Sequence, residues 1–467
     1  MSGRPKLLWT FVYSNWRFRH RSERVTSWEL DLLPDRKFGG EMTNINSSVS
    51  NSHPRRPTIL GWLRVAALLS FALLAGGLRL ANAQEVSGIY TDGTTKDLGD
   101  KTKIDWLKNI KLRGWVEGSY IWNFNKVNPN VANANLGKSA IQDQNLTIEG
   151  QAFHTHDNSV TLDLAEIEVE KVPERGSVGF KLDLAAGDIQ DTIVQTIKSV
   201  SPNGVSDFDR TFQQASISYL APVGKGLRFD FGKFVTHIGG ETIESIKNRN
   251  FSHSFFYSYA IPFQDSGIRM NYAFSPKAYA ELYILNGWNV TFDNNRGKTY
   301  GLSFGLTPSS KFSAYLNYLG GPEHNNNSGD WRHLGDFQVG YSPVATLSMM
   351  ANIDVGQDNK GAGPGKNALW RGITYYLRPA VKGRFFPTLR AEYYEDRDGF
   401  TTGVPQHLWG FTVTPDYKLG SEDDFVHVLL RPEIRYNKSS AKFFSQENNF
   451  RSLDHQWTVG AGIVAYF

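Results

Sequence analysis

The 467-residue chain contains no cysteine, so it has no disulfide bond, no zinc–thiolate site and no cysteine nucleophile. It also has little overall apolar character, with a mean hydropathy of −0.39. A protein that crosses a membrane with a bundle of apolar helices would have a higher value. The composition therefore excludes thiol chemistry and a helical membrane protein.

Strong charge of either sign is also lacking, since the formal net charge is only +4. Residues 1–83 hold 12 of the 50 Lys and Arg residues but only 5 of the 46 Asp and Glu residues. The rest of the chain consequently carries three more acidic than basic groups. This balance gives no basic footprint for a nucleic acid, so a nucleic-acid partner is not expected.

Aromatic residues make up 13% of the chain, and a regular pattern of them marks its end. Every second residue from Trp457 to Phe467 is apolar, and most of the residues between are small or polar. A period of two places these sets on opposite faces of a β-strand. One face then suits hydrocarbon and the other a wet interior, as in a transmembrane β-barrel. An edge strand of a soluble sandwich is the alternative for this stretch alone.

The same alternation recurs from residue 110 onward, and the polar face carries charge. One strand places Arg431, Glu433 and Arg435 on that face, and burying each unpaired ion in a sandwich core would cost several kcal/mol. Short turns alternate with longer polar connections. Among these connections are one that runs to about residue 210 and the stretches 320–332 and 357–366. We therefore predict an all-β fold: a transmembrane, antiparallel, up-and-down β-barrel of about 16 strands, with short periplasmic turns and long outer loops.

The region before the barrel resembles a secretion signal. Arg55 and Arg56 precede an apolar run, and Ala81-Asn82-Ala83 matches a signal-peptidase site. The uninterrupted apolar core is only about 14 residues, short of the ~20 that a membrane-anchoring helix needs. We expect a signal peptide over 42–83, a periplasmic lead-in over 84–109 and the barrel over 110–467. We interpret residues 1–41 as a disordered extension or a mis-assigned start; the sequence leaves open whether translation begins at Met1 or Met42.

Two blocks of sequence resemble a known family. The first is Pro222-Val223-Gly224-Lys225-Gly226-Leu227, followed by Gly232-Lys233-Phe234-Val235-Thr236-His237-Ile238-Gly239 and Glu241; the second is Asn286-Gly287-Trp288, followed by Asp293-Asn294-Asn295 and Lys298. Their order and spacing resemble those of the OmpL-like β-barrel porin-2 family. The resemblance covers about 110–467 and implies an outer-membrane channel, without fixing a solute.

The segment 237–264 is too long and too polar for a tight turn, and we hypothesise that it folds inward and constricts the pore. Its carboxylates Glu241 and Glu244 would then face basic residues of the wall, namely Arg269, Arg390, Arg431 and Arg435. Opposed charges across a constriction orient dipolar solutes, and rings of charge set ion preference. Replacing both glutamates by Gln should shift selectivity toward anions. In the alternative, the arginines pair with Glu392 and Glu433 and the loop lies outside.

Other chemistry has weaker support. His237 and Glu241 have the spacing of metal ligands, but no further ligands cluster near them in the sequence. His253-Ser254 is only weak evidence for a hydrolase, which needs three catalytic groups brought together. We therefore predict no enzyme, metal or cofactor. A passive porin for small hydrophilic solutes or ions is preferred over a barrel hydrolase or a non-conducting surface-binding barrel. The expected surroundings are the lipid of a Gram-negative outer membrane, the barrel-assembly machinery acting through Phe467, and a possible homotrimer.

Overall fold

The computed structural model describes residues 96–97, 110–128, 148–200, 205–379, 384–421 and 425–467. The predicted extension over 1–41 and the signal peptide over 42–83 lie outside these residues. So does the lead-in over 84–109, apart from the two-residue strand β1, Lys96–Asp97, which pairs with the start of β2.

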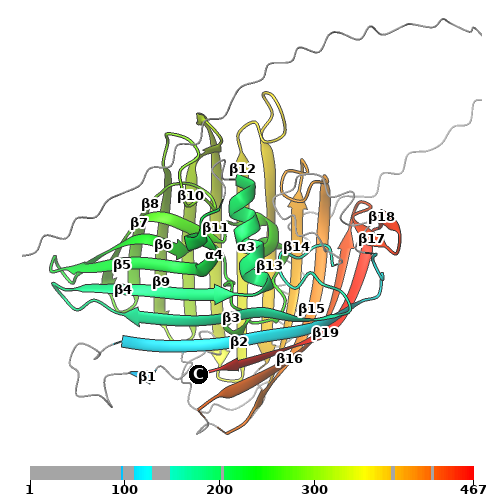
Figure 1. The fold of residues 1–467 in the computed structure, drawn as a ribbon, viewed down its shortest axis with the longest axis horizontal. Helices are drawn as coiled ribbons and strands as arrows, with labels where there is room; N and C mark the ends of the chain where they lie inside the picture. Colours follow the sequence, from blue (N-terminus) through cyan, green and yellow to red (C-terminus); the bar gives the residue numbers. More distant parts are fainter. Residues whose placement is uncertain (1–95, 98–109, 129–147, 201–204, 380–383, 422–424) are drawn as a thin grey trace, which may run out of the picture. The chain divides into compact units, whose positions relative to one another are not determined.

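The described residues form a closed barrel of sixteen antiparallel strands, as predicted (Figure 1). The barrel strands are β2 Ile110–Asn123, β3 Ser159–Lys171, β4 Val178–Ala186, β5 Phe212–Ala221, β6 Leu227–Val235, β7 Gln264–Ser275, β8 Ala278–Leu285, β9 Thr299–Ser309, β10 Phe312–His324, β11 Asn327–Val344, β12 Leu347–Asp358, β13 Ala368–Pro379, β14 Phe385–Asp396, β15 Gln406–Leu419, β16 His427–Ser439 and β19 His455–Tyr466.

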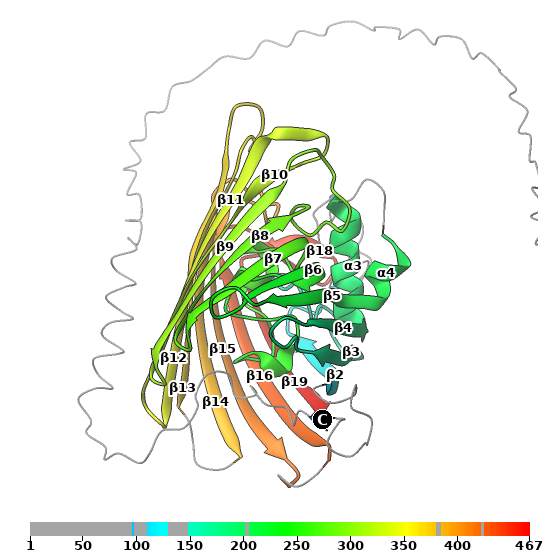
Figure 2. The ribbon, with the colours of Figure 1, turned by 90° about the vertical axis from the view of Figure 1, so that its left-hand side faces the viewer.

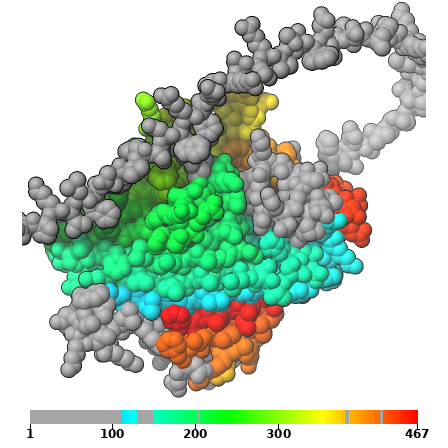
Figure 3. Space-filling view, in the orientation of Figure 1, coloured from blue at the N-terminus to red at the C-terminus, as the bar shows by residue number. Residues whose placement is uncertain are grey.

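The first and last barrel strands close the cylinder. Strand β19 pairs with β2 from Thr458↔Asn123 to Tyr466↔Trp115, and Phe467 continues the ladder through two backbone hydrogen bonds with Gly114. In Figure 3 the red surface of the C-terminal strand lies directly against the cyan surface of β2. Because this seam is paired along its length, the sheet has no free edge there.

The alternation of the sequence becomes an apolar outer face. Large apolar side chains on many strands are exposed, including Val116, Ile217, Phe231, Leu316, Phe411 and Ile463. Their neighbours in sequence point inward; on β19, for example, Trp457 and Val459 are exposed while Gln456 and Thr458 are buried. This is the arrangement expected of a wall with hydrocarbon outside and polar groups inside.

Two connections differ from the sequence-based prediction. The stretch 320–332 is not a loop, because β10 and β11 continue through it and are joined at Asn325 and Asn326. Polar residues fit there because the strands extend beyond the apolar band.

The stretch before β5 is helical rather than irregular, with α3 Asp188–Val200 and α4 Asp207–Thr211. Ile189, Ile193 and Ile197 recur every four residues and form one buried face of α3, which explains the helix. Figure 2 shows both helices beside the short strands β4 and β5. No helix among the described residues is long and apolar enough to cross a membrane.

Candidate functional site

The connection between β6 and β7, residues 236–263, lies inside the barrel; we call it the inward loop. Its Gly240 amide donates to Asn352 on β12 at 2.7 Å, and its Asn250 side chain donates to Thr414 on β15 at 2.7 Å. Strand β15 is eight positions from β7 in a sixteen-strand barrel. The inward loop therefore reaches from its own strands to the opposite wall.

The inward loop has an apolar core of its own. It contains the short helices η2 Ser245–Lys247 and η3 Phe256–Ala260. Ile238, Ile243, Phe255 and Phe256 are buried in one cluster with the isoleucines of α3. The loop is thus packed as a folded element, and burial of these apolar side chains stabilises its position.

Three of the predicted arginines hold the inward loop against the wall. Arg390 on β14 donates to the Ser252 carbonyl, Arg431 on β16 to the Ser245 carbonyl, and Arg435 on β16 to the His253 carbonyl at 2.8 Å. The exposed fractions of these guanidinium side chains are 0%, 0% and 1%. They touch the backbone of the loop rather than open water.

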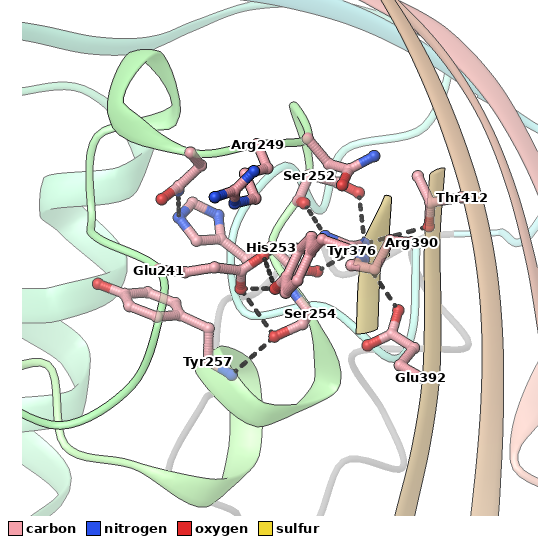
Figure 4. A network of polar contacts seen from close by, with 12 residues as sticks. Glu241, Arg249, Ser252, His253, Ser254, Tyr257, Tyr376, Arg390, Glu392 and Thr412 are labelled. Atoms are coloured by element: carbon pink, nitrogen blue, oxygen red, sulfur yellow. Dashed lines mark hydrogen bonds and ion pairs between the residues drawn. The ribbon is translucent and has the colours of Figure 1, made fainter. Parts of the chain in front are cut away.

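Glu241 meets one of these arginines directly. Its Oε1 lies 3.2 Å from Arg390 Nη1 and accepts a hydrogen bond from Tyr376 at 2.8 Å, while Oε2 accepts from the Ser254 amide and hydroxyl (Figure 4). Burial by itself raises the pKa of Glu241, but Arg390 and the remaining partners hold it below its usual value. Glu241 is therefore charged and fully partnered.

Carboxylates of the barrel wall also bind the inward loop. From the sequence, Glu392 and Glu433 were expected to pair with the arginines only if the loop lay outside the barrel. Glu433 accepts from the Phe251 and Ser252 amides at 3.1 Å, and Glu392 accepts from the Phe255 amide at 2.6 Å. Arg435 also pairs with Glu392 at 3.3 Å. Arg390, Arg431 and Arg435 thus bind wall carboxylates and the loop at the same time.

Glu244 points to a different wall. It accepts from Gln213 on β5 at 3.2 Å and pairs with Lys247 at 3.1 Å. Burial raises the pKa of Glu244, but the charge of Lys247, the hydrogen bonds of the carboxylate and the charge of Lys181 together hold the pKa below its usual value. The two glutamates predicted to act together are therefore on opposite sides of the inward loop.

Arg269 is separate from the other predicted residues. It pairs with Asp230 on β6 at 2.8 Å and keeps 26% of its side chain exposed. It lines a cavity of about 280 Å³ together with Glu281, Tyr279, Tyr315 and Gln338. The inward loop bounds this cavity, so the open space lies along the inner faces of β7–β11.

The hints of other chemistry are not supported by the side-chain geometry. The Ser254 hydroxyl donates to Glu241 at 2.7 Å, whereas His253 Nε2 contacts the Thr242 carbonyl at 2.8 Å. His237 Nε2 contacts the Tyr318 carbonyl at 3.2 Å. Neither histidine serves as a base for the neighbouring serine or shares a ligand position with Glu241.

Comparisons with known proteins agree with this architecture. The model of the family described as "Putative beta-barrel porin-2, OmpL-like" matches residues 109–467. No curated protein gives a match.

Three solved structures are similar to this chain at low identity, each with a TM-score under 0.5. An anion-selective porin from Comamonas acidovorans has 10% identity and a TM-score of 0.48, covering 77% of this chain and 99% of its own. The outer membrane channel DcaP of Acinetobacter baumannii has 10% identity and a TM-score of 0.46, covering 77% and 96%. The outer-membrane expressed OmpT of Vibrio cholerae has 9% identity and a TM-score of 0.45, covering 77% and 98%. These likenesses are too distant to support an argument about solutes.

The family match spans the whole barrel, including both sequence blocks that resembled it. The chain belongs to the OmpL-like β-barrel porin-2 family and is an outer-membrane porin.

Proposed function

We propose that the protein is a passive channel for small hydrophilic solutes or ions, narrowed by the inward loop. The observation that carries the proposal is the attachment of that loop to the far wall by Arg390, Arg431 and Arg435. A loop held in this way occupies part of the bore and leaves the remainder beside β7–β11.

The predicted site residues then divide into two roles. Glu241, Arg390, Arg431 and Arg435 are buried and hold the loop in place, and Glu244 secures its other side. Arg269, with Glu281, borders the open cavity. Charges that border the water path set ion preference more strongly than charges that are buried and paired.

Planar-bilayer recording of the purified protein tests the channel directly. We expect stable conductance steps and, in liposome swelling, faster entry of small sugars and amino acids than of large ones. Protein that is folded but never conducts would instead support a surface-binding barrel. Hydrolysis of lipid or peptide by the same preparation would support a barrel enzyme.

The membrane context forms part of the proposal. The exposed apolar band would contact lipid of a Gram-negative outer membrane, and Phe467, whose ring stacks on Phe425 at 5.7 Å, would serve as the assembly signal. Deletion of Phe467 should lower the amount of folded barrel in the outer membrane. Cross-linking in membranes would show whether the channel is a homotrimer.

A further inference from the structure

Three ionisable side chains that were not among the predicted site residues meet on the inner side of the barrel wall, next to the inward loop. They are Glu117 on β2, Asp163 on β3 and His154 in the segment before β3. Glu117 Oε1 lies 3.0 Å, and Asp163 Oδ2 3.8 Å, from His154 Nε2, and the three ligand atoms lie within 4.8 Å of one another. The side chains are 0%, 1% and 0% exposed.

Each carboxylate is oriented by a hydroxyl group. Ser245 of the inward loop donates to Glu117 Oε2, and Thr161 donates to Asp163 Oδ1 at 2.6 Å. The other oxygen of each carboxylate is thereby turned toward His154 Nε2. Asp163 Oδ2 has no hydrogen-bond partner although it is buried, and leaving a buried acceptor unsatisfied is costly.

We propose that Glu117, His154 and Asp163 bind a divalent transition-metal ion such as Zn²⁺. One imidazole nitrogen with two carboxylate oxygens suits such an ion, whereas Ca²⁺ and Mg²⁺ prefer oxygen ligands alone. Zinc–ligand distances of about 2.0–2.2 Å allow two ligand atoms to lie up to ~4.4 Å apart. The two separations from His154 Nε2 both meet this limit, and the ion would satisfy Asp163 Oδ2.

The ion would connect separate parts of the protein. It would link β2 and β3 to the segment 148–158 and, through the Ser245 hydroxyl on Glu117, to the inward loop. Hydroxyl groups that orient metal-binding carboxylates affect the affinity themselves. Metal binding should therefore stabilise both the pairing of β2 with β3 and the inward loop.

A proton is the competing occupant. A doubly protonated His154 between two carboxylates would form an ion pair with the same three residues and no metal. The two possibilities differ in whether the folded protein retains a stoichiometric ion.

The test uses the full chain without a polyhistidine tag, folded in detergent and stripped with EDTA. Zn²⁺ and Co²⁺ serve as probes, followed by equilibrium dialysis with elemental analysis and by the visible absorption of bound Co²⁺. We expect about one ion per chain, with Zn²⁺ displacing Co²⁺. Glu117→Gln and Asp163→Asn should each weaken binding by at least about tenfold, and so should Ser245→Ala, which leaves every ligand in place.

A matched control is Asp230→Asn, which removes a buried wall carboxylate that pairs with Arg228 and Arg269. It should bind the probes like the unaltered protein. Heat-modifiable gel mobility verifies that each variant is folded, and Ser245→Ala carries the test if the ligand variants do not fold. Failure of the folded, unaltered protein to retain an ion, or equal binding by all the variants, overturns the proposal.

Discussion

The ring of Phe251 in the inward loop lies over the backbone of Gly462 on β19, so that a Cβ atom at Gly462 would clash with it. Gly462 faces the barrel interior, and the Phe251 amide is bound to Glu433 at 3.1 Å. The missing side chain of a glycine in the wall thus provides the space in which the loop is seated.

Gly462→Val should move Phe251 away from the wall. Overpacking of this kind costs about 1–3 kcal/mol, which weakens the attachment of the inward loop. We expect noisier single-channel currents and faster proteolytic cleavage within 236–263. Gly335→Val is the matched control, because the nearest atom to its added Cβ is 4.0 Å away. Equal noise in the two variants would contradict this assignment.

Arg390→Met should weaken the attachment of the inward loop more strongly than the double variant that combines it with Glu241→Gln. Removing one member of a buried ion pair costs about 3–5 kcal/mol because the other charge is left unpaired. In Arg390→Met the unpaired charge is Glu241. Urea unfolding of Arg390→Met, Glu241→Gln and the double variant gives the coupling energy, and the double variant should recover part of the loss. Strict additivity of the two changes would rule out the pairing.

Ion preference should follow the residues that line the cavity. Arg269→Gln should shift selectivity toward cations and Glu281→Gln toward anions, since each removes a charge from the open side of the inward loop. Reversal potentials in a salt gradient measure both effects. The shift toward anions predicted from sequence for Glu241→Gln and Glu244→Gln is measured in the same way. A larger effect from these buried glutamates than from Arg269 and Glu281 would reverse the roles proposed here.

The inward loop should loosen in acid. Burial lowers the pKa of His253 and of His237 from 6.5 to about 4, against the opposing effects of Glu241 on His253 and of Asp336 on His237. A displaced loop, with ordinary histidine pKa values, binds protons more readily than the packed loop. The stabilisation is therefore complete above pH 6.5 and is lost as the pH falls from 6.5 toward 4.

Single-channel recording between pH 7.5 and 4 should show increasing current noise across that window. His253→Gln removes one of the two titrating groups and should flatten the response. Its control is His333→Gln, a histidine on β11 that contacts the Tyr318 hydroxyl away from the loop. A pH response that survives unchanged in His253→Gln would exclude this histidine as a cause.

The hydrophobic pattern was sufficient to predict the wall. Alternation with a period of two places Trp457 and Val459 outside and Gln456 and Thr458 inside whatever the neighbouring strands are, because a strand has only two faces. Strand number and closure followed from repetition of that pattern. Local polarity was a weaker guide to where strands and helices end. The polar stretch 320–332 belongs to β10 and β11, and the polar stretch before residue 210 contains α3.

The length and polarity of 237–264 predicted that this segment folds inward, but they could not indicate which partner each charged side chain would contact. Glu241 and Glu244 are three residues apart in sequence and face different walls. Arg269 lies on the polar face of its strand, as Arg390 does, but it pairs with Asp230 beside the open cavity. Glu117, His154 and Asp163 showed no motif at all, because β2, β3 and the segment before β3 bring them together only in the closed barrel. The sequence by itself determined which face of each strand is polar. Only the tertiary structure decided which polar groups meet, since those contacts depend on where one long loop is seated inside the closed sheet.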